Sequence, residues 1–265
     1  MSDSRPIGVF DSGVGGLTVL RAISERLPTE SLVYFGDCAR VPYGTKSPET
    51  VLRYSREAAS YLLRRDIKML VIACNTATAA ALPSLSAELR IPVVGVVDPG
   101  ALSAVRATKG RVGVIATEGT IRSNAYRDAI HRIDPSIEVI EAACPLFVPL
   151  AEEGWANTRV AREVAEVYLT PLLDAGIDTL VLGCTHYPIL RATIKEVVGE
   201  RVIIVDSAET TAEAVALRLH DSGEIAPEQE RVCHFLVTDA ADRFKRIAAD
   251  FLEHQIEQLE LVSVG

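Results

Sequence analysis

Two matching stretches decide the predicted fold: Ile7-Gly8-Val9-Phe10-Asp11-Ser12-Gly13 near the start of the chain and Val112-Gly113-Val114-Ile115-Ala116-Thr117 near its middle. Each opens with a short, continuous apolar run and ends in small or polar residues. Continuous runs of this length are typical of strands buried on both faces of a parallel sheet. With their glycines matched, the stretches lie 105 residues apart, which indicates an internal duplication.

Further features repeat at nearly the same distance, with offsets of 106, 110 and 108 residues. In that order they are Cys38 with Cys144, Cys74 with Cys184, and the strand ends Val97-Asp98 with Val205-Asp206. Eight predicted strands fall into two sets of four: Ile7–Phe10, Ser31–Phe35, Met69–Ala73 and Val93–Val97, then Val112–Ile115, Ile137–Ile140, Thr179–Leu182 and Val202–Val205.

Amphipathic segments such as Pro48–Arg65 alternate with the apolar runs, so the sequence predicts an α/β fold. We expect two similar domains with largely parallel sheets flanked by helices, related by a pseudo-twofold duplication, with the active site between them. Residues 1–97 and 207–265 are expected to form the first domain, and residues 98–206 the second. The C-terminal part is predicted to return to the first domain through a helix, an acidic loop at Ser222–Glu230, a strand at Val232–Val237, a further helix and a last strand.

Composition excludes some classes of function. The chain has 265 residues, 48% of them hydrophobic, and its net charge of -9 argues against a nucleic-acid surface. No apolar stretch reaches the roughly 18 residues of a membrane span, and the N-terminus lacks the basic and apolar segments of a secretory signal. We therefore expect a cytoplasmic protein that acts on a small molecule, without a nucleic-acid or membrane partner.

Five cysteines are present, an odd number without C-x-x-C spacing, which argues against a disulfide framework or a structural zinc site. A free cysteine is by default a small buried hydrophobe. Cys74 and Cys184 differ from the others because each ends a strand at an equivalent place and is followed by a polar, Thr-bearing turn. Cys38 and Cys144 are also duplicated but lack such a turn, so we interpret both as structural.

Thiols at two equivalent strand ends suit the inversion of a stereocentre. Ligands bind outside the carboxyl ends of parallel strands, so two facing sheets bring Cys74 and Cys184 to one cavity from opposite sides. Inversion needs a base on one face and an acid on the other, and neighbouring groups can poise a thiol in either state. Asp11 is such a neighbour in the first half, and His186 in the second. The sequence therefore predicts a racemase that moves a Cα proton between two thiols.

Two polar turns, Ser12–Thr18 and Asn75–Thr78, are suited to binding a small anion. Each follows a strand and opens a helix, where free amides and the positive helix end favour a carboxylate or a phosphate. Thr18 stands where the third glycine of G-x-G-x-x-G belongs, and no Gly-Lys-Ser/Thr follows. The pattern therefore does not predict a nucleotide site.

Four motifs in order, DSGVGGLTVL (11–20), ARVPYG (39–44), ACNTAT (73–78) and GCTHYP (183–188), resemble those of the glutamate racemases, within the aspartate/glutamate racemase superfamily. The resemblance spans about the first 210 residues. It implies a two-base enzyme that needs no pyridoxal cofactor and supplies D-glutamate for peptidoglycan. It also implies that Cys74 acts on the D-enantiomer with help from Asp11, and Cys184 on the L-enantiomer with help from His186.

The same resemblance implies which residues hold the carboxylates and the ammonium of the substrate: Asp11, Ser12, Tyr43, Gly44, Asn75, Thr76, Thr185 and His186. Glu153 matches an acidic position that the family places near the catalytic groups. Glu152 beside it stays open as the alternative, and either could be a solvated charge.

Three other functions stay open. A Cys–His amidase or hydrolase, with Cys184 as nucleophile and His186 as base, leaves Cys74 and the duplication unexplained. A non-catalytic binding protein explains the anion turns but not the paired thiols, and an aspartate racemase would share the framework. No ligand cluster predicts a metal, and no lysine ends a strand in a glycine-rich setting, so we expect neither a metal nor a cofactor. A homodimer is left open.

Overall fold

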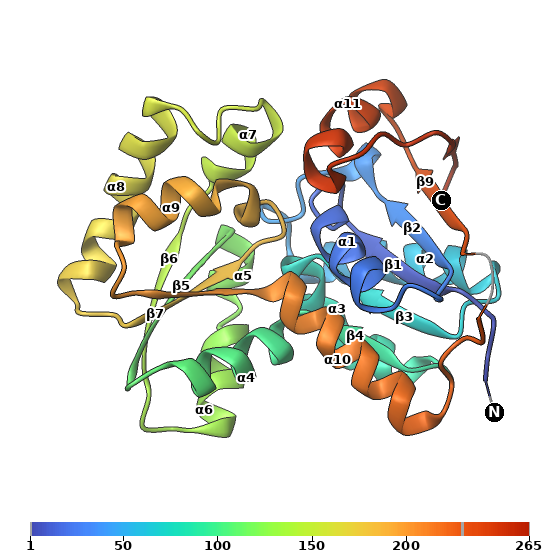
Figure 1. Ribbon diagram of the computed structural model, residues 1–265, viewed down its shortest axis with the longest axis horizontal. Coiled ribbons are helices and arrows are strands. Elements are labelled where there is room, and N and C mark those ends of the chain that lie inside the picture. Colours follow the sequence, from blue (N-terminus) through green and yellow to red (C-terminus); the bar gives the residue numbers. More distant parts are fainter. Residues whose placement is uncertain (1, 229–230, 265) are drawn as a thin grey trace.

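The computed structural model describes residues 2–228 and 231–264, and its strands form two sheets in two lobes (Figure 1). The strands are β1 (Ile7–Asp11), β2 (Leu32–Gly36), β3 (Met69–Ile72), β4 (Val93–Gly95), β5 (Arg111–Ala116), β6 (Glu138–Ala143), β7 (Thr179–Gly183), β8 (Ile203–Asp206), β9 (Cys233–Val237) and β10 (Leu259–Leu261). Among the described residues, the first lobe holds a six-stranded sheet, in the order β10-β9-β2-β1-β3-β4. The second lobe holds a four-stranded sheet, in the order β6-β5-β7-β8.

Strand order confirms the duplication, because β2-β1-β3-β4 in the first sheet has the same order as β6-β5-β7-β8 in the second. Every strand pair in the described part of the chain is parallel. The two repeated glycines also pack alike. A Cβ atom on Gly8 would lie 2.7 Å from Cδ1 of Ile67, and one on Gly113 would lie 2.7 Å from Cδ1 of Ile177. The α/β fold with two parallel sheets is therefore as predicted.

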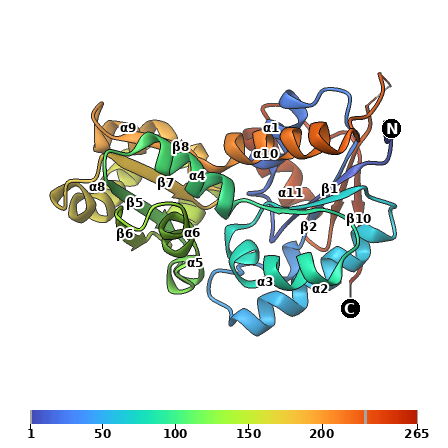
Figure 2. The ribbon, with the colours of Figure 1, turned by 90° about the horizontal axis from the view of Figure 1, so that it is seen from below.

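Helices cover both faces of each sheet (Figures 1 and 2). They are α1 (Leu17–Arg26), α2 (Pro48–Leu63), α3 (Asn75–Glu88), α4 (Val97–Ala107), α5 (Glu118–Arg122), α6 (Ala125–Ile133), α7 (Phe147–Glu152), α8 (Arg159–Asp174), α9 (Arg191–Val198), α10 (Ser207–Ser222) and α11 (Ala241–Leu252), with short 3-10 turns at Cys38–Arg40 and Tyr187–Leu190. In the first lobe α1, α10 and α11 pack on one face and α2 and α3 on the other; in the second lobe α8 and α9 oppose α4 and α6.

One predicted strand end is wrong. The fourth strand ends at Gly95, and Val97-Asp98 lie in the first turn of α4. This turn suits the local sequence, since Asp98 is favoured near a positive helix end and Pro99 has no N–H to leave unbonded there. In the second half Asp206 does end β8, and its side chain caps α10 by accepting a hydrogen bond from the Ala208 amide (2.8 Å).

The C-terminal part returns to the first lobe, where β9 pairs with β2 and β10 with β9. Helix α10 makes the crossing, beginning at the end of β8 and running along α1 (Figures 1 and 2). The predicted acidic loop Ser222–Glu230 is described up to residue 228, and residues 229 and 230 lie outside the described part. The domain limits at residues 97/98 and 206/207 stay a prediction.

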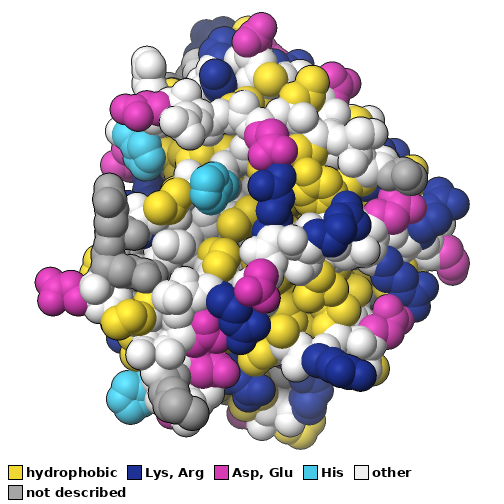
Figure 3. All heavy atoms as spheres, turned by 90° about the vertical axis from the view of Figure 1, so that its right-hand side faces the viewer, with side chains coloured by type: hydrophobic (Ala, Val, Ile, Leu, Met, Phe, Trp, Pro, Cys, Tyr) yellow, Lys and Arg dark blue, Asp and Glu magenta, His cyan; other side chains and the backbone are white. Residues whose placement is uncertain are grey.

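The surface of the first lobe mixes acidic and basic side chains around apolar areas (Figure 3). In residues 2–228 and 231–264, no helix combines the length and the apolar character needed to cross a membrane.

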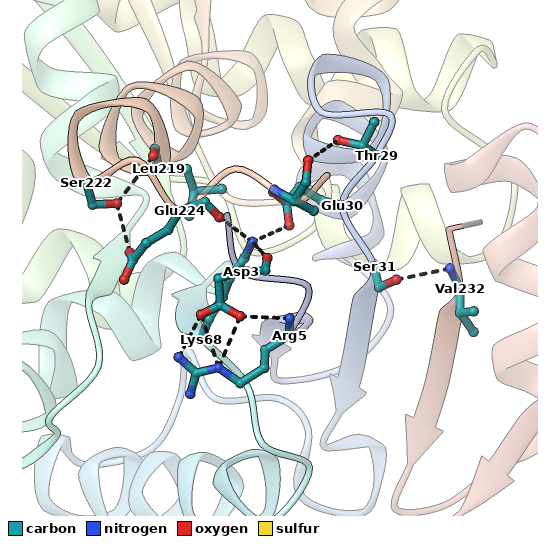
Figure 4. Close-up of polar contacts among 11 residues, drawn as sticks. Asp3, Arg5, Thr29, Glu30, Ser31, Lys68, Leu219, Ser222, Glu224 and Val232 are labelled. Carbon is teal, nitrogen blue, oxygen red and sulfur yellow. Dashed lines mark hydrogen bonds and ion pairs between the residues drawn. The ribbon is translucent and has the colours of Figure 1, made fainter. Parts of the chain in front are cut away.

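A buried ion pair fastens the return segment to the first lobe (Figure 4). The Lys68 ammonium lies 2.7 Å from Oε2 of Glu30, and both side chains are fully buried. Lys68 also donates to the carbonyls of Asp3 and Glu224, both at 2.7 Å. The second Glu30 oxygen accepts from the amide of Ala226 (2.7 Å). One lysine therefore joins the N-terminal segment, the start of β3 and the chain beyond α10.

Replacing Lys68 by methionine should lower the free energy of unfolding by about 3–5 kcal/mol, because Glu30 then remains as a buried charge without its partner. Urea denaturation followed by circular dichroism measures the change. The control is Arg56→Met, which removes the exposed pair with Glu88 and should cost no more than about 1 kcal/mol. An equal loss of unfolding free energy in the two variants would show that the buried ion pair stabilises the fold no more than the exposed one.

Candidate active site

The carboxyl ends of β1, β3 and β7 meet at a narrow cavity between the lobes. Its volume is about 40 Å³, room for only a few water molecules. The cavity brings together nine residues predicted from the sequence: Ser12, Tyr43, Gly44, Cys74, Asn75, Thr76, Cys184, Thr185 and His186. Val41, Pro42, Thr117 and Val148 complete the lining. The two thiols therefore reach one cavity from different lobes.

Cys74 lies between the end of β3 and the first residue of α3, where its sulfur accepts a hydrogen bond from the Ala77 amide (3.4 Å). Burial, followed by the negative charge of Asp11, raises the pKa of the Cys74 thiol to about 12. Cys74 is therefore a protonated thiol near neutral pH, able to donate a proton.

Asp11 ends β1 beside this thiol and is fully buried. One carboxylate oxygen accepts from the Gly13 amide (2.9 Å), and the other is buried without a hydrogen-bond partner in the described part of the chain. Burial raises the pKa of Asp11 above its usual value, although the charge of His186 opposes the shift. Asp11 is thus a carboxyl group whose proton affinity depends on the charge of its neighbours.

The second thiol lies in a different electrostatic setting. The Cys184 sulfur lies 3.9 Å from Nδ1 of His186, whose Nε2 lies 3.0 Å from Oε1 of Glu152. Burial by itself lowers the pKa of His186, but contacts with Cys184 and Glu152 outweigh it and raise the pKa to about 10. A protonated imidazole can donate a hydrogen bond from Nδ1 to the Cys184 sulfur. The two halves of the cavity therefore differ in charge.

Glu152, and not Glu153, contacts His186. Its second carboxylate oxygen accepts from Arg243 (3.0 Å), and these partners hold the pKa of Glu152 below its usual value despite burial. Glu153 follows the last residue of α7, has a half-exposed side chain and contacts Arg243 at 3.0 Å. The geometry favours the alternative over the Glu153 assignment. Periodicity could not separate the last residue of a six-residue helix from the residue that follows it.

Close approach of the lobes depends on glycines. A Cβ atom on Gly15 would lie 2.4 Å from both Nδ1 of His186 and Oγ1 of Thr185. A Cβ atom on Gly44 would lie 2.7 Å from Cβ of Thr117. Because real Cβ contacts are longer, only glycine lets these loops meet in this way.

Tyr43 lines the cavity, but its hydroxyl is hydrogen-bonded elsewhere. The hydroxyl donates to Oδ2 of buried Asp37, which also accepts from Nε of Arg40 (2.7 Å). The predicted contact of Tyr43 with a substrate is thereby limited to its backbone and ring. Asp37 holds the loop that carries Tyr43 and Gly44.

Sequence reasoning missed three hydroxyl or phenol groups near the cavity. Oγ1 of Thr76 lies 2.9 Å from Oγ1 of Thr117 and 3.2 Å from that of Thr120, across the two lobes. Tyr126 donates to Oδ1 of Asn75 (2.7 Å). A signal for Thr117 existed, because the duplication aligns it with Ser12. Nothing in the sequence pointed to Thr120 or Tyr126.

The remaining cysteines lie apart from this cavity. All five cysteines belong to the described residues and are free thiols. Burial raises the pKa of Cys38 and of Cys233 to about 12. The described part of the chain holds no group of three or more His, Cys, Asp or Glu side chains arranged for a metal ion.

The duplicated α/β chain, with two parallel sheets and a cavity between its lobes, belongs to the class of racemases. The family model for Asp/Glu/Hydantoin racemase matches residues 7–215, and the chain belongs to this family, in its glutamate racemase branch. The glutamate racemase of Geobacter metallireducens is 57% identical over 98% of this chain and 97% of that protein.

Solved structures agree with this assignment. A glutamate racemase isoform from Bacillus anthracis superposes with a TM-score of 0.95 at 43% identity, covering 98% of this chain and 97% of that one. The Francisella tularensis glutamate racemase in complex with D-glutamate gives a TM-score of 0.93 at 38% identity, with 98% of both chains covered. The aspartate racemase of Picrophilus torridus, at 19% identity, covers 84% of this chain and 96% of that one, with a TM-score of 0.59, and shares the fold alone.

The glycine contact between the lobes gives a stability prediction. Gly15→Ala should lower the free energy of unfolding by about 1–3 kcal/mol, because the added methyl group overlaps His186 and Thr185. The matched control is Gly13→Ala, whose Cβ would meet only Val41, at an ordinary 3.5 Å. Urea unfolding of both variants measures the difference. A Gly15→Ala variant as stable as the Gly13→Ala control would contradict the close approach.

Proposed function

We propose that this chain interconverts L- and D-glutamate by moving the Cα proton between Cys74 and Cys184. The observation that carries the proposal is the presence of both thiols at one cavity, each delivered by an equivalent strand end of a different lobe. The glutamate racemases at 45–57% identity, together with the D-glutamate in the Francisella structure, support glutamate as the substrate.

In the proposed reaction on L-glutamate, Cys184 is the base. His186, held by Glu152, keeps its proton and stabilises the Cys184 thiolate, which takes the Cα proton from one face. Cys74 then delivers its own proton to the other face of the carbanion, and its pKa near 12 makes it the acid in this direction. Asp11 assists Cys74 in the reverse direction, in which the roles exchange. Because the two thiols supply both base and acid, the proposed chemistry calls for no cofactor.

Polar groups of the cavity are proposed to bind the charged ends of glutamate. The positive end of α3 and the side chains of Asn75 and Thr76 suit a carboxylate. Ser12 lies beside the Cys74 thiol, Thr185 directly follows Cys184 in the chain, and Tyr43 and Gly44 contribute backbone groups. Since the cavity measures only about 40 Å³, we infer that the lobes separate to admit the substrate.

In the cell, we propose that the enzyme acts in the cytoplasm and that its D-glutamate enters peptidoglycan synthesis. We also propose that residues 1–97 with 207–265, and residues 98–206, are the domains that move relative to one another. A homodimer is compatible with this proposal but is not required by it, because one chain supplies both thiols.

The Cys184–His186–Glu152 arrangement also supports a second candidate, a cysteine hydrolase or amidase. In that reaction Cys184 would be the nucleophile and His186 the base. The two candidates differ in their need for Cys74, which only the racemase uses.

Substitution of each cysteine by serine distinguishes the racemase from the hydrolase. Cys74→Ser and Cys184→Ser should each lower glutamate racemisation by about 10²–10⁴-fold, since inversion needs a group on both faces. Circular dichroism in deuterated water follows the reaction, and mass spectrometry measures the Cα deuterium gained by the product. If Cys74→Ser kept wild-type racemisation, the two-thiol mechanism would fail, and an inert wild-type chain with an intact fold would rule out the substrate.

The pH profile tests the role of Glu152. Its carboxylate raises the pKa of His186, so Glu152→Gln should lower that pKa from about 10. In this variant His186 loses its proton at a lower pH than in the wild type, and the proposed Cys184 thiolate is then left without a cationic neighbour. We expect the alkaline limb of the kcat/KM profile to move to lower pH in Glu152→Gln, whereas Glu153→Gln should leave it in place. Identical shifts in the two variants would mean that neither acts through His186.

A further inference from the structure

Asn75 presents its side-chain amide in one orientation at the wall of the cavity. Its side chain is buried, and Oδ1 accepts a hydrogen bond from the Tyr126 hydroxyl (2.7 Å). The amide nitrogen Nδ2 is buried too, and no hydrogen-bond acceptor meets it in the described part of the chain. A buried amide donor without a partner is unusual and requires an explanation.

We propose that Tyr126 is a positioning residue that holds the Asn75 amide with its oxygen toward the second lobe and its NH₂ group toward the cavity, as a donor for a substrate carboxylate. This inference rests on the proposed function, because glutamate supplies the carboxylate. It adds a residue that contacts no substrate and acts through Asn75.

The hydrogen bond from the Tyr126 hydroxyl favours one direction of the amide. The Tyr126 side chain is buried, so its hydroxyl proton needs an acceptor, and Oδ1 of Asn75 supplies one. With the amide reversed, the NH₂ group would face the hydroxyl and leave its proton without that acceptor. The amide oxygen would then face the cavity and repel a carboxylate. One orientation satisfies both the tyrosine and an anionic ligand.

The tyrosine ring has little freedom to follow a rotated amide. A Cβ atom on Gly100 of α4 would lie 3.2 Å from the ring, and one on Gly183 at the end of β7 would lie 3.0 Å from it. The ring therefore packs directly on the backbone of both elements. Burial also raises the pKa of Tyr126 above its usual value, which keeps the hydroxyl protonated as a donor.

This hydrogen bond joins the lobes. Asn75 begins α3 in the first lobe, whereas Tyr126 lies in α6 of the second. The amide therefore has its binding orientation fixed only while the lobes are together. Lobe closure would then complete the carboxylate site as well as bring the thiols into range.

The test is Tyr126→Phe, which removes the hydroxyl and keeps the ring. We expect KM to rise about tenfold for both L- and D-glutamate, the loss of roughly one hydrogen bond to a charged group. The change in kcat should stay within about threefold, because the thiols and His186 are untouched.

Tyr187→Phe is the matched control. Tyr187 is a buried tyrosine of the second lobe whose hydroxyl donates to the Cys144 carbonyl at 2.8 Å, a partner that does not line the cavity. We expect a similar fall in the urea midpoint from both variants but no rise in KM from Tyr187→Phe. Equal rises in KM from the two would overturn the inference, because loss of packing would then explain both.

A double-mutant cycle with Asn75→Ala decides whether Tyr126 acts through Asn75. If it does, the double variant should have the KM of Asn75→Ala alone, within about twofold. Effects that multiply would overturn the inference, as would an unchanged KM in Tyr126→Phe beside an active wild type. A wild-type chain that leaves glutamate unchanged would instead overturn the proposed function, and this inference with it.

Discussion

The arrangement of the cavity depends on the approach of one glycine to the opposite lobe. Gly15 lies so close to Thr185 and His186 that even a methyl group would overlap them. The hydroxyl of Thr18 extends this contact by donating to the Thr185 carbonyl (3.1 Å). The contact joins the turn after β1 to the turn after β7. Because β1 pairs with β3, whose end carries Cys74, the contact also helps to set the separation of the two thiols.

The duplication gives the two thiols equivalent places but not equivalent surroundings. Cys74 lies beside a buried carboxyl group, which opposes its ionisation, whereas Cys184 lies beside the imidazole of His186. The difference arises from elements without a counterpart in the other half. Glu152, at the end of α7, supports His186, and Arg243 in α11 of the C-terminal return contacts Glu152. The symmetry of the backbone and the asymmetry of the charges therefore have separate origins in the chain.

The sequence predicted the strands, their parallel pairing and the meeting of the two cysteines because these follow from local patterns repeated along the chain. It misplaced Val97-Asp98, since a strand end and a helix start share the same apolar run there. It also failed to separate Glu152 from Glu153, and it gave no sign of Tyr126. The roles of Glu152, Glu153 and Tyr126 depend on which side chains meet across α6, α7 and the cavity. Such contacts between distant segments leave no periodic pattern in a single sequence.

The buried lysine described above also bears on the order in which the chain folds. Lys68 needs the carbonyl of Glu224 as well as Glu30, and β2 receives its neighbour β9 only near the C-terminus. The second lobe, in contrast, is built from strands that follow one another in the chain. During synthesis on the ribosome, the second lobe can form from contiguous residues, while the first lobe keeps an open sheet edge until the segment with β9 and β10 has been made. The N-terminal half of this chain is therefore expected to be the later one to fold, and the one that most needs protection from aggregation as it emerges.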